Sequence, residues 1–410
     1  MRIAYISSDH GIPVLGGKGA SIHIQELINA FYTLGHEVSL LSARLGTGTE
    51  ATISAEIIKV RAPDKTACQI HPQSGDGGER LHKEQRYIEI GRAMEAAILE
   101  HHAKTPFDLI YERYSLWSLA GVRAARRIGV PCIVEVNAPL LVEQQRYRKL
   151  ALTDVAAEIE AEIFSSADAI ICVSDAVRDY VSSKAKDRSR LHLIPNGVNL
   201  AQFNPSVKPS RIDGLGDGPV IGFTGSLKPW HGIQNLLEAF RQIRETLLSP
   251  RLLIVGDGPL RSWIEGFAEG ARLTDDIIIT GWTDHRELPG LIKRMDVTVA
   301  PYPDIEGFYF SPLKLFEYLA VGRPIVASAV GQVAQIVTDS KDGLLSRPGD
   351  RAHLADCIFK LLYDKDLQTR IGAAAAKTAH NFSWRGNAEK VIDIAKTIAA
   401  NQSTRMALHG

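Results

Sequence analysis

The sequence is poor in cysteine, has no surplus of charge and lacks long apolar runs. Its four cysteines, Cys68, Cys132, Cys172 and Cys357, are scattered without a Cys-x-x-Cys pair, which predicts buried free thiols and argues against a zinc site. Because 47 basic residues balance 47 acidic ones, nothing favours nucleic acid as a partner. No apolar run reaches membrane-spanning length, and the start lacks the apolar core of a signal peptide. We therefore predict a cytoplasmic protein and leave peripheral contact with a membrane as an open alternative.

The sequence does contain a regular alternation of short apolar segments with amphipathic segments of helical spacing. At 410 residues the chain exceeds the size at which one hydrophobic core usually stops growing, so we expect two domains. Strand–helix alternation at this spacing predicts a parallel, doubly wound sheet. In the first half, the expected strands are Arg2–Ser7, Glu37–Leu41, Ile57–Arg61, Leu109–Tyr111, Cys132–Val136, Ala169–Val173 and Leu191–Ile194. The expected helices there are Ser21–Leu34, Gln85–Ala103, Ser115–Ile128, Asp154–Ser165 and Ala176–Ser183.

A second alternation of the same kind begins at Val220. Its expected strands are Val220–Thr224, Leu252–Val255, Ile277–Thr280, Val297–Ala300, Ile325–Ala327 and Leu344–Leu345. Its expected helices are Ile233–Leu248, Leu260–Glu269, Arg286–Met295, Leu313–Val321, His353–Asp364, Leu367–Ala379 and Trp384–Ala400. The segment 204–219 is rich in proline and glycine and is the best linker candidate. We predict an α/β protein with Rossmann-like domains at 1–203 and 220–380 and a terminal helical segment at 381–410.

The segment from Glu306 to Ser328 carries the most chemistry. It reads as a turn, a proline where a helix can start, an amphipathic helix, and a Gly-Arg-Pro stop before a strand. The amides of the first turn, at Ser311–Leu313, would lie at the positive end of the helix dipole, which suits a phosphate. Lys314 would add charge there, and Glu317 could accept hydrogen bonds from a ribose one turn further on. An ordinary buried helix with a surface lysine is the alternative.

This segment resembles the nucleotide-sugar signature of the family-four retaining glycosyltransferases, which have the GT-B fold. Further motifs resemble the same family in the same order along the chain. They are the N-terminal strand Met1–Ser7 followed by Gly16–Ser21, the stretch Leu193–Asn199, the loop Gly225–Gly232, the stretch Leu253–Pro259 and the stretch Ile279–Trp282. The resemblance covers nearly the whole chain. It implies two Rossmann-like domains that face a central cleft, with the last helix crossing back to the first domain.

The resemblance also implies which residues form the site. A nucleotide-sugar donor, UDP-linked in our expectation, would bind the second domain without a metal or another cofactor. The residues expected to act in catalysis are Lys228, Lys314, Glu317 and Asn137. Those expected to contact the donor are Gly16, Gly17, Gly225, Ser226, Lys228, Gly258, Trp282, Tyr309, Phe310, Ser311, Pro312, Leu313 and Glu317. On the acceptor side we expect Lys18, His23, Arg113, Glu135 and Asn137, with further contacts from the segment 62–80.

The sequence departs from the family pattern at two positions. Tyr309 stands where the first glutamate of the E-x7-E motif is expected, so the contact with the donor sugar falls to Tyr309, Glu306 or backbone amides. Asn137 stands where many relatives have a histidine beside the transferred sugar. A side-chain amide can form hydrogen bonds but cannot act as a general base.

Two glycine-rich segments have competing interpretations. Gly214–Gly218 looks like part of a dinucleotide fingerprint, but it precedes a strand where the fingerprint should follow one, so a flexible linker is favoured. Gly16–Gly19 looks like a P-loop, but Ile12 occupies the place of the first Walker glycine and Lys18 is not followed by Ser or Thr. We expect Gly16 and Gly17 to let the backbone approach a ligand, with a purely structural turn as the alternative.

We predict a transferase, a monomer or a homodimer, that moves a hexose from a nucleotide-diphosphate sugar to a hydroxyl acceptor. The resemblance implies that the anomeric configuration is retained. Two alternatives remain open. One is a GT-B nucleotide-sugar epimerase, which would release a free sugar without an acceptor. The other is a non-catalytic nucleotide-sugar binding module, which Tyr309 and Asn137 suggest.

Overall fold

The computed structural model describes residues 1–48, 53–61, 76–185, 187–247 and 249–409. Cys68 and most of the expected acceptor segment 62–80 lie outside these residues. The chain forms two compact units, of which the first comprises Met1–Pro195 and Trp384–Gly410 and the second Asn196–Ser383. Within the described part of the chain, no helix is both long enough and apolar enough to cross a membrane.

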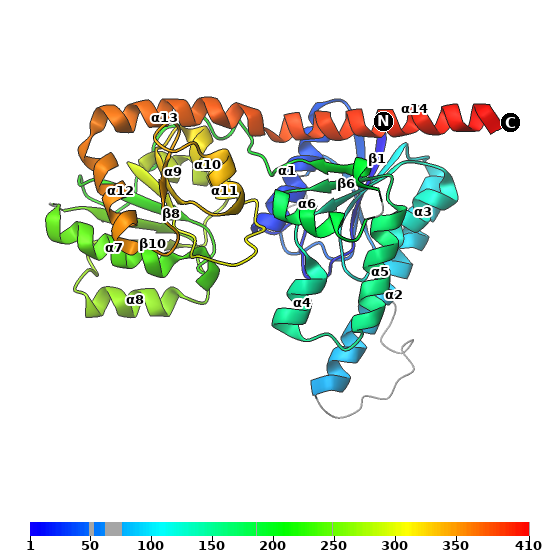
Figure 1. The fold of residues 1–410 in the computed structure, drawn as a ribbon, viewed down its shortest axis with the longest axis horizontal. Helices are drawn as coiled ribbons and strands as arrows, with labels where there is room; N and C mark the ends of the chain where they lie inside the picture. The colour runs from blue at the N-terminus through cyan, green and yellow to red at the C-terminus, as the bar shows by residue number, and fades with distance from the viewer. Residues whose placement is uncertain (49–52, 62–75, 186, 248, 410) are drawn as a thin grey trace. The chain divides into compact units, whose positions relative to one another are not determined.

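The first unit is built on a sheet of seven parallel strands in the order β3-β2-β1-β4-β5-β6-β7 (Figure 1). The strands are β1 (Arg2–Ser7), β2 (Glu37–Ser42), β3 (Glu56–Lys59), β4 (Leu109–Arg113), β5 (Cys132–Val136), β6 (Ala169–Cys172) and β7 (Leu191–Leu193). The helices are α1 (Gly19–Thr33), α2 (Asp76–Lys104), α3 (Ala120–Ile128), α4 (Leu140–Arg148), α5 (Thr153–Ser166), α6 (Asp175–Ser182) and α14 (Trp384–His409), with a 3₁₀ turn η3 at Arg188–Arg190. The strand order reverses between β1 and β4, and crevices for ligands form at such points in open α/β sheets.

Strand registration brings polar side chains together at the carboxyl end of this sheet. Tyr5 pairs with Tyr111, Ser7 with Arg113, and Arg113 with Glu135. Since paired residues of parallel strands share a face and residues two apart do too, all five side chains lie on one face. Helix α1 covers this face, because Phe31 packs edge-on against Tyr111 with ring centroids 5.8 Å apart. Helix α14 in turn packs along α1.

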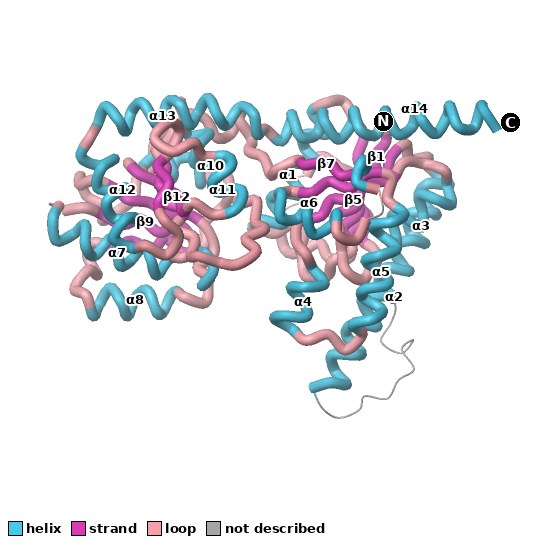
Figure 2. Tube along the Cα trace, in the orientation of Figure 1, coloured by secondary structure: helices cyan, strands magenta, loops and turns pink. Residues whose placement is uncertain are grey.

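The second unit has six parallel strands in the order β10-β9-β8-β11-β12-β13 (Figure 2). They are β8 (Val220–Thr224), β9 (Arg251–Val255), β10 (Ile277–Gly281), β11 (Val297–Ala300), β12 (Ile325–Ser328) and β13 (Leu344–Ser346). The helices are α7 (Ile233–Thr246), α8 (Arg261–Gly270), α9 (Leu288–Arg294), α10 (Leu313–Val321), α11 (Gly331–Ile336), α12 (Arg351–Tyr363) and α13 (Lys365–Ala379), with 3₁₀ turns η4 (Pro229–His231) and η5 (His380–Phe382). The order reverses between β8 and β11.

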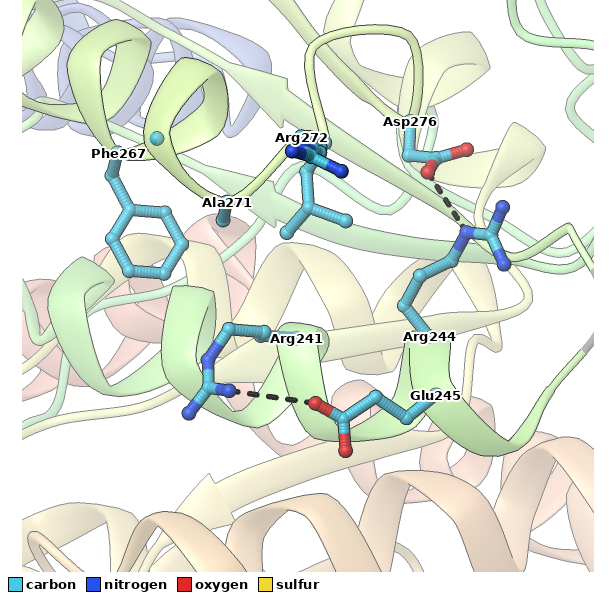
Figure 3. Close-up of a pocket in the computed structure, with 9 residues that line it drawn as sticks. Arg241, Arg244, Glu245, Phe267, Ala271, Arg272 and Asp276 are labelled. Atoms are coloured by element: carbon cyan, nitrogen blue, oxygen red, sulfur yellow. Dashed lines mark hydrogen bonds and ion pairs between the residues drawn. The ribbon is translucent and has the colours of Figure 1, made fainter.

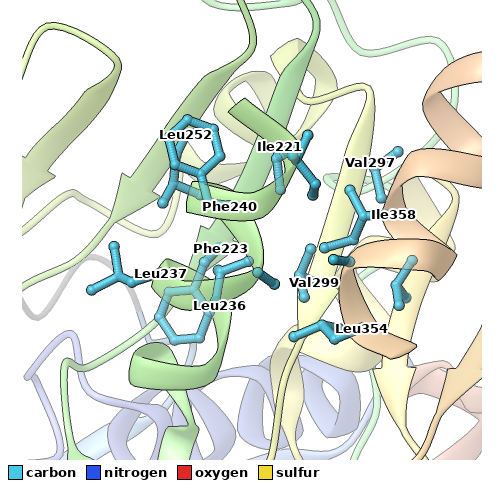
Figure 4. Packing of buried hydrophobic residues seen from close by; sticks show 14 of the residues in the cluster. Ile221, Phe223, Leu236, Leu237, Phe240, Leu252, Val297, Val299, Leu354 and Ile358 are labelled. Carbon is cyan, nitrogen blue, oxygen red and sulfur yellow. The ribbon is translucent and has the colours of Figure 1, made fainter. Parts of the chain in front are cut away.

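The core of the second unit lies between this sheet and helices α7 and α12 (Figure 4). Phe223 and Val299 from the strands meet Leu236 of α7 and Leu354 of α12, and all four are buried. Fully burying a side chain of this kind contributes roughly 1.5–3 kcal/mol, so this layer fixes the ends of β8 and β11 firmly. The loops at those ends carry the chemistry described below.

The fold class predicted from the sequence, two α/β domains each with a parallel sheet, is confirmed. Every expected strand is present, with bounds that differ by at most two residues. Two helices were not predicted, α4 and α11. The segment 204–219, expected as a linker, lies within the second unit.

Candidate functional site

The loops that follow β8 and β9 pack backbone against backbone, which requires glycine. A Cβ atom on Gly256 would lie 2.0 Å from the carbonyl oxygen of Gly225, and one on Gly258 would lie 2.7 Å from the amide nitrogen of Leu227. The Gly225 amide donates to the Val255 carbonyl over 2.9 Å, which fixes the two loops together. The result is a rigid glycine-lined edge at the carboxyl end of the second sheet, the usual place for a ligand.

Helix α10 is tied to the same edge. The phenolic oxygen of Tyr318 accepts a hydrogen bond from the Thr224 amide over 2.7 Å, at the last residue of β8. Pro312 precedes the helix, and no side chain caps its first turn. The first-turn amides of Leu313 and Lys314 are therefore donors at the positive end of the helix dipole. Pro312 has no N–H and cannot contribute to this set, which corrects the expectation that residues 311–313 all supply amides.

Lys314 is buried beneath this edge, which is unusual for a lysine. Its Nζ lies 3.8 Å from the ring centroid of Phe223 and makes no hydrogen bond with any residue in the described part of the chain. It points at the loop after β8, since a Cβ on Gly225 would lie 2.9 Å from Nζ. Burial lowers the pKa of Lys314 to about 7, although the Glu317 carboxylate favours its charged form. A buried lysine without a hydrogen-bond partner among these residues and the unpaired first-turn amides of the same helix together could hold an anion, and this candidate position is called the anion seat below.

The start of α10 is also held from the segment that opens the second unit. The Asn196 amide donates to Ser311 Oγ over 2.9 Å, and Asn196 Nδ2 donates to the Ser311 carbonyl over 2.6 Å. The two residues are 115 positions apart in the sequence. Ser311 is buried, and it immediately precedes Pro312. Asn196 therefore fixes the position of the turn from which the anion seat is built.

Glu317 is buried one turn further along α10. Its Oε1 accepts a hydrogen bond from His285 Nε2 over 2.8 Å. The His285 carbonyl in turn accepts from Gln202 Nε2 over 3.2 Å, and the imidazole packs against the ring of Phe203. The sequence did not point to His285. The expected contact between Glu317 and a ribose stays a prediction.

The loop between β8 and α7 holds Lys228 and His231. Lys228 Nζ lies 4.9 Å from the Trp230 ring centroid. The Nδ1 atom of His231 lies 2.5 Å from the Ser226 carbonyl, which can only accept, so Nδ1 carries the proton. Burial, followed by repulsion from Lys314, lowers the pKa of His231 to about 3. His231 is therefore neutral, and its Nε2 is an acceptor that does not donate to a phosphate.

The remaining donor-side predictions fall on more open positions. The Trp282 side chain, directly after β10, is 67% exposed and is available for stacking. Tyr309 and Phe310 lie together with ring centroids 4.4 Å apart, and Glu306 is exposed. Their contacts with a donor stay predictions.

Four of the five residues expected on the acceptor side, all except Lys18, form an ionic cluster in the first unit. Glu135 Oε1 lies 2.9 Å from His23 Nε2, and Glu135 Oε2 lies 3.2 Å from Asn137 Nδ2 and 3.7 Å from Arg113 Nη1. Burial raises the pKa of Glu135, but His23, Arg113 and Asn137 outweigh it and lower the pKa to about 2. Trp384 packs edge-on against the His23 ring at 4.8 Å. Arg113 and Glu135 thus neutralise each other.

The glycine loop before α1 makes a tight turn. The Gly16 amide donates to the Pro13 carbonyl over 2.8 Å, and a Cβ at Gly16 would lie 3.0 Å from that oxygen. Gly17 and Lys18 are exposed, and Lys18 precedes α1 without a side-chain cap. This geometry allows both interpretations, a close approach to a ligand and a structural turn.

Two of the cavities in the described residues are large enough for a small molecule. One, of about 590 Å³, lies in the first unit at the ends of β1 and β4 and contains none of the five expected acceptor-side residues. The other, of about 670 Å³, lies in the second unit between the ends of α7 and α8 (Figure 3). There Arg241 pairs with Glu245 and Arg244 with Asp276, and none of the expected donor residues lines the cavity.

Two Rossmann-like sheets, each with polar groups at its switch point, and an anion seat at a helix start are the features of a nucleotide-sugar transferase. A family model described as Glycosyltransferase Family 4 matches residues 17–202, and one described as Glycosyl transferases group 1 matches residues 218–364. Together they span most of the chain. The chain belongs to the group 1, family-four glycosyltransferases, enzymes that transfer a sugar from a nucleotide sugar.

Two of the curated relatives align over nearly their whole length. A D-inositol 3-phosphate glycosyltransferase of Xylanimonas cellulosilytica is 25% identical over 397 residues, which is 92% of this chain and 91% of the relative. A glycogen synthase of Mycobacterium tuberculosis is 24% identical over 398 residues, covering 94% of this chain and 92% of the relative.

Solved structures show the same fold. Sucrose-phosphate synthase from Thermosynechococcus elongatus has a TM-score of 0.74 at 23% identity, with 98% of this chain and 99% of that chain covered. Anabaena HepE in complex with UDP-glucose has a TM-score of 0.69 at 18% identity, with 98% and 100% covered.

Proposed function

We propose that this enzyme transfers a hexose from a UDP-sugar to a hydroxyl acceptor with retention of the anomeric configuration and without a required metal. The observation that carries the proposal is Lys314, a buried ammonium with no hydrogen-bond partner among the described residues, aimed at the glycine loop after β8. A buried unpaired charge costs stability, so its presence at a ligand-binding edge indicates an anionic ligand.

The proposed chemistry is stabilisation of a leaving diphosphate. As the glycosidic bond breaks, negative charge grows on the diphosphate, and Lys314 with the Leu313 amide would stabilise it there. Lys228, on the neighbouring loop, would add a second cation. Preorganised charges of this kind act without reorganising at the moment of reaction.

Two arguments support retention of the anomeric configuration without a covalent enzyme intermediate. One is the family, and the other is that none of the expected residues is a suitable nucleophile. Asn137 cannot take a proton, and Glu135 is buried and bound by His23, Asn137 and Arg113. We propose that an oxygen of the leaving diphosphate accepts the proton of the acceptor hydroxyl. The new glycosidic bond then forms on the face from which the diphosphate departs.

The comparisons support the choice of donor. HepE, which has the same fold, has been crystallised with UDP-glucose and with UDP. In this chain we propose that Glu317 binds the ribose and that exposed Trp282 stacks on the base, with Tyr309, Phe310 and Glu306 near the sugar. We also propose a cytoplasmic location, which suits the free, buried thiols of Cys132, Cys172 and Cys357.

The experiment is UDP release from UDP-glucose and UDP-N-acetylglucosamine, measured with and without extracts that contain acceptors. Release that depends on acceptor supports transfer. Release of UDP and free sugar without acceptor would indicate the epimerase-type alternative. Binding of the nucleotide sugar with no turnover under any condition would indicate a binding module.

A further inference from the structure

The cavity in the first unit lies where the rule for open α/β sheets places a ligand. It is lined by the loop after β1, the loop after β4, the start of α2 and the end of α4. Its volume of about 590 Å³ is within the range of sites for small molecules. We propose that this cavity is the acceptor site and that the acceptor is a hydroxylated compound of monosaccharide size that carries an anionic group. The proposal rests on the function proposed above.

Cations without ion-pair partners among the described residues line the cavity and are available to an anion. Lys83, Arg148 and Lys149 line it, and none of them has an ion-pair partner within the described ranges. Two of the lining carboxylates are committed to backbone amides instead. Glu84 accepts from the amides of Ala151 at 3.0 Å and Leu152 at 2.7 Å, and Asp9 accepts from the Gly11 amide at 2.6 Å.

Glu79 and Glu143 also line the cavity, as does Arg80. The lining thus carries four cations and four carboxylates, and backbone amides already occupy oxygens of two of the carboxylates, Glu84 and Asp9. Since Lys and Arg side chains bind phosphate and carboxylate through charge-assisted hydrogen bonds, an anionic group on the ligand would be held by this set.

The turn at the end of α4 carries Arg148 and Lys149, has a strained backbone and is held in place by hydrogen bonds. Lys149 has φ of 55° and ψ of 112°, a left-handed conformation that residues other than glycine rarely adopt. The surrounding structure holds it there, because buried Glu84 binds the amides of the next two residues, Ala151 and Leu152. Strain of this kind costs on the order of 1–3 kcal/mol and gathers at ligand sites. Here it fixes the end of α4 against the cavity.

A histidine that can accept a hydrogen bond from a ligand hydroxyl also lines the cavity. The Nδ1 atom of His10 is buried and has no hydrogen-bond partner among the residues that the structure describes. Its ring lies 6.5 Å from that of Tyr87, over which Lys83 Nζ sits at 5.9 Å. Burial and the charges of Arg44 and Arg86 lower the pKa of His10, so the ring is neutral and Nδ1 can accept. A hydroxyl group of a bound sugar would donate a hydrogen bond to this Nδ1 atom.

The test uses matched probes on the full-length protein. Glucose, galactose and mannose are each offered as the free sugar, the 6-phosphate and the uronic acid, and binding is measured by calorimetry without donor. We expect the anionic forms to bind about ten- to a hundredfold more tightly than the free sugars, as for a charge-assisted hydrogen bond. The phosphate and uronate arms show which anion the cavity prefers.

Variants localise the binding. The double substitution Lys83→Ala with Arg148→Ala should weaken the anionic sugar at least tenfold, while Arg126→Ala, an exposed arginine of α3, should not. The affinity for UDP should be unchanged in both. Equal binding of free and anionic sugars, no binding of any anionic sugar, or full binding to the double variant would overturn the proposal. Loss of UDP binding by the wild-type protein would count against the proposed function instead, since the sugars are measured without donor.

Discussion

Replacing Lys314 with methionine should stabilise the empty protein and abolish donor binding. Lys314 is buried, and burial lowers its pKa from 10.5 to about 7. At 1.36 kcal/mol per pKa unit, keeping the charge in the folded state costs on the order of 4–5 kcal/mol. Loss of the contact with the Phe223 ring offsets about 1–2 kcal/mol of the gain. We therefore expect Lys314→Met to raise the free energy of unfolding by about 2–4 kcal/mol at pH 7.

The lowered pKa of Lys314 also predicts how the stability difference between wild type and Lys314→Met changes with pH. In the folded state Lys314 loses its proton near pH 7, whereas in the unfolded chain it keeps the proton up to pH 10.5. The unfolded state therefore binds more protons between these values, and wild-type stability from this group rises with pH. The advantage of Lys314→Met should be full below pH 7 and shrink by about 1.4 kcal/mol per pH unit above it. UDP affinity of the wild type should fall above pH 7, because the phosphate needs the charged lysine.

Urea unfolding of both proteins at pH 6, 7, 8 and 9 is the assay, with UDP calorimetry at each pH. Lys341→Met, which removes an exposed lysine of the same unit, is the matched control and should change stability by less than about 0.5 kcal/mol. The reasoning is refuted if Lys314→Met is less stable than wild type, if its gain is the same at pH 6 and pH 9, or if it still binds UDP.

Three further substitutions test the neighbouring residues. Glu317→Ala should weaken UDP about ten- to a hundredfold in a folded protein, by calorimetry, and unchanged affinity would make Glu317 structural. Lys228→Ala should lower kcat about a hundredfold with a smaller change in KM; a raised KM with intact kcat would mean that Lys228 only holds the donor. Asn196→Ala keeps the backbone hydrogen bond to Ser311 Oγ but loses the one from Nδ2 to the Ser311 carbonyl, so kcat should fall at least tenfold. Thr378→Val, which loses a hydrogen bond elsewhere in the unit, should cost similar stability and leave kcat intact. If both variants lower kcat equally, Asn196 is merely structural.

The fold could be predicted from the sequence because its strands are nearly continuous apolar runs. All five residues of β8 are buried, as are all five of β5, and such runs between helical patterns have few other interpretations. Helix α4 was missed because Leu141 is its one buried residue, so its sequence has no apolar periodicity. Helix α11, Gly331–Ile336, has six residues, too few for a periodic signal.

The site could be predicted in outline and not in its contacts. The motif around Pro312 placed a helix start and Lys314 on the donor side. Sequence spacing carries no information that Lys314 is buried against Phe223 or that Asn196 binds Ser311, since both are long-range contacts. The cluster of His23, Arg113 and Glu135 follows from strand register and helix packing. Without the strand register and the helix packing, the sequence does not show that these expected acceptor-side residues pair with one another.

The cavity in the first unit was missed for a different reason. Its lining comes from four separate elements, and one of them, α4, was not predicted. A signal was present in the rule that ligands gather at the carboxyl ends of strands on either side of a switch point. Applied to β1 and β4, it points to the segments after Ser7 and after Arg113, which do line the cavity.

Calorimetry of UDP with the wild-type protein in excess chelator tests the central claim most directly. The claim is that the second unit binds a nucleotide diphosphate through Lys314 and the start of α10, without a metal. We expect UDP to bind with the same affinity with and without chelator and to show no binding to Lys314→Met. Loss of all UDP affinity in chelator, or undiminished binding to Lys314→Met, would contradict it.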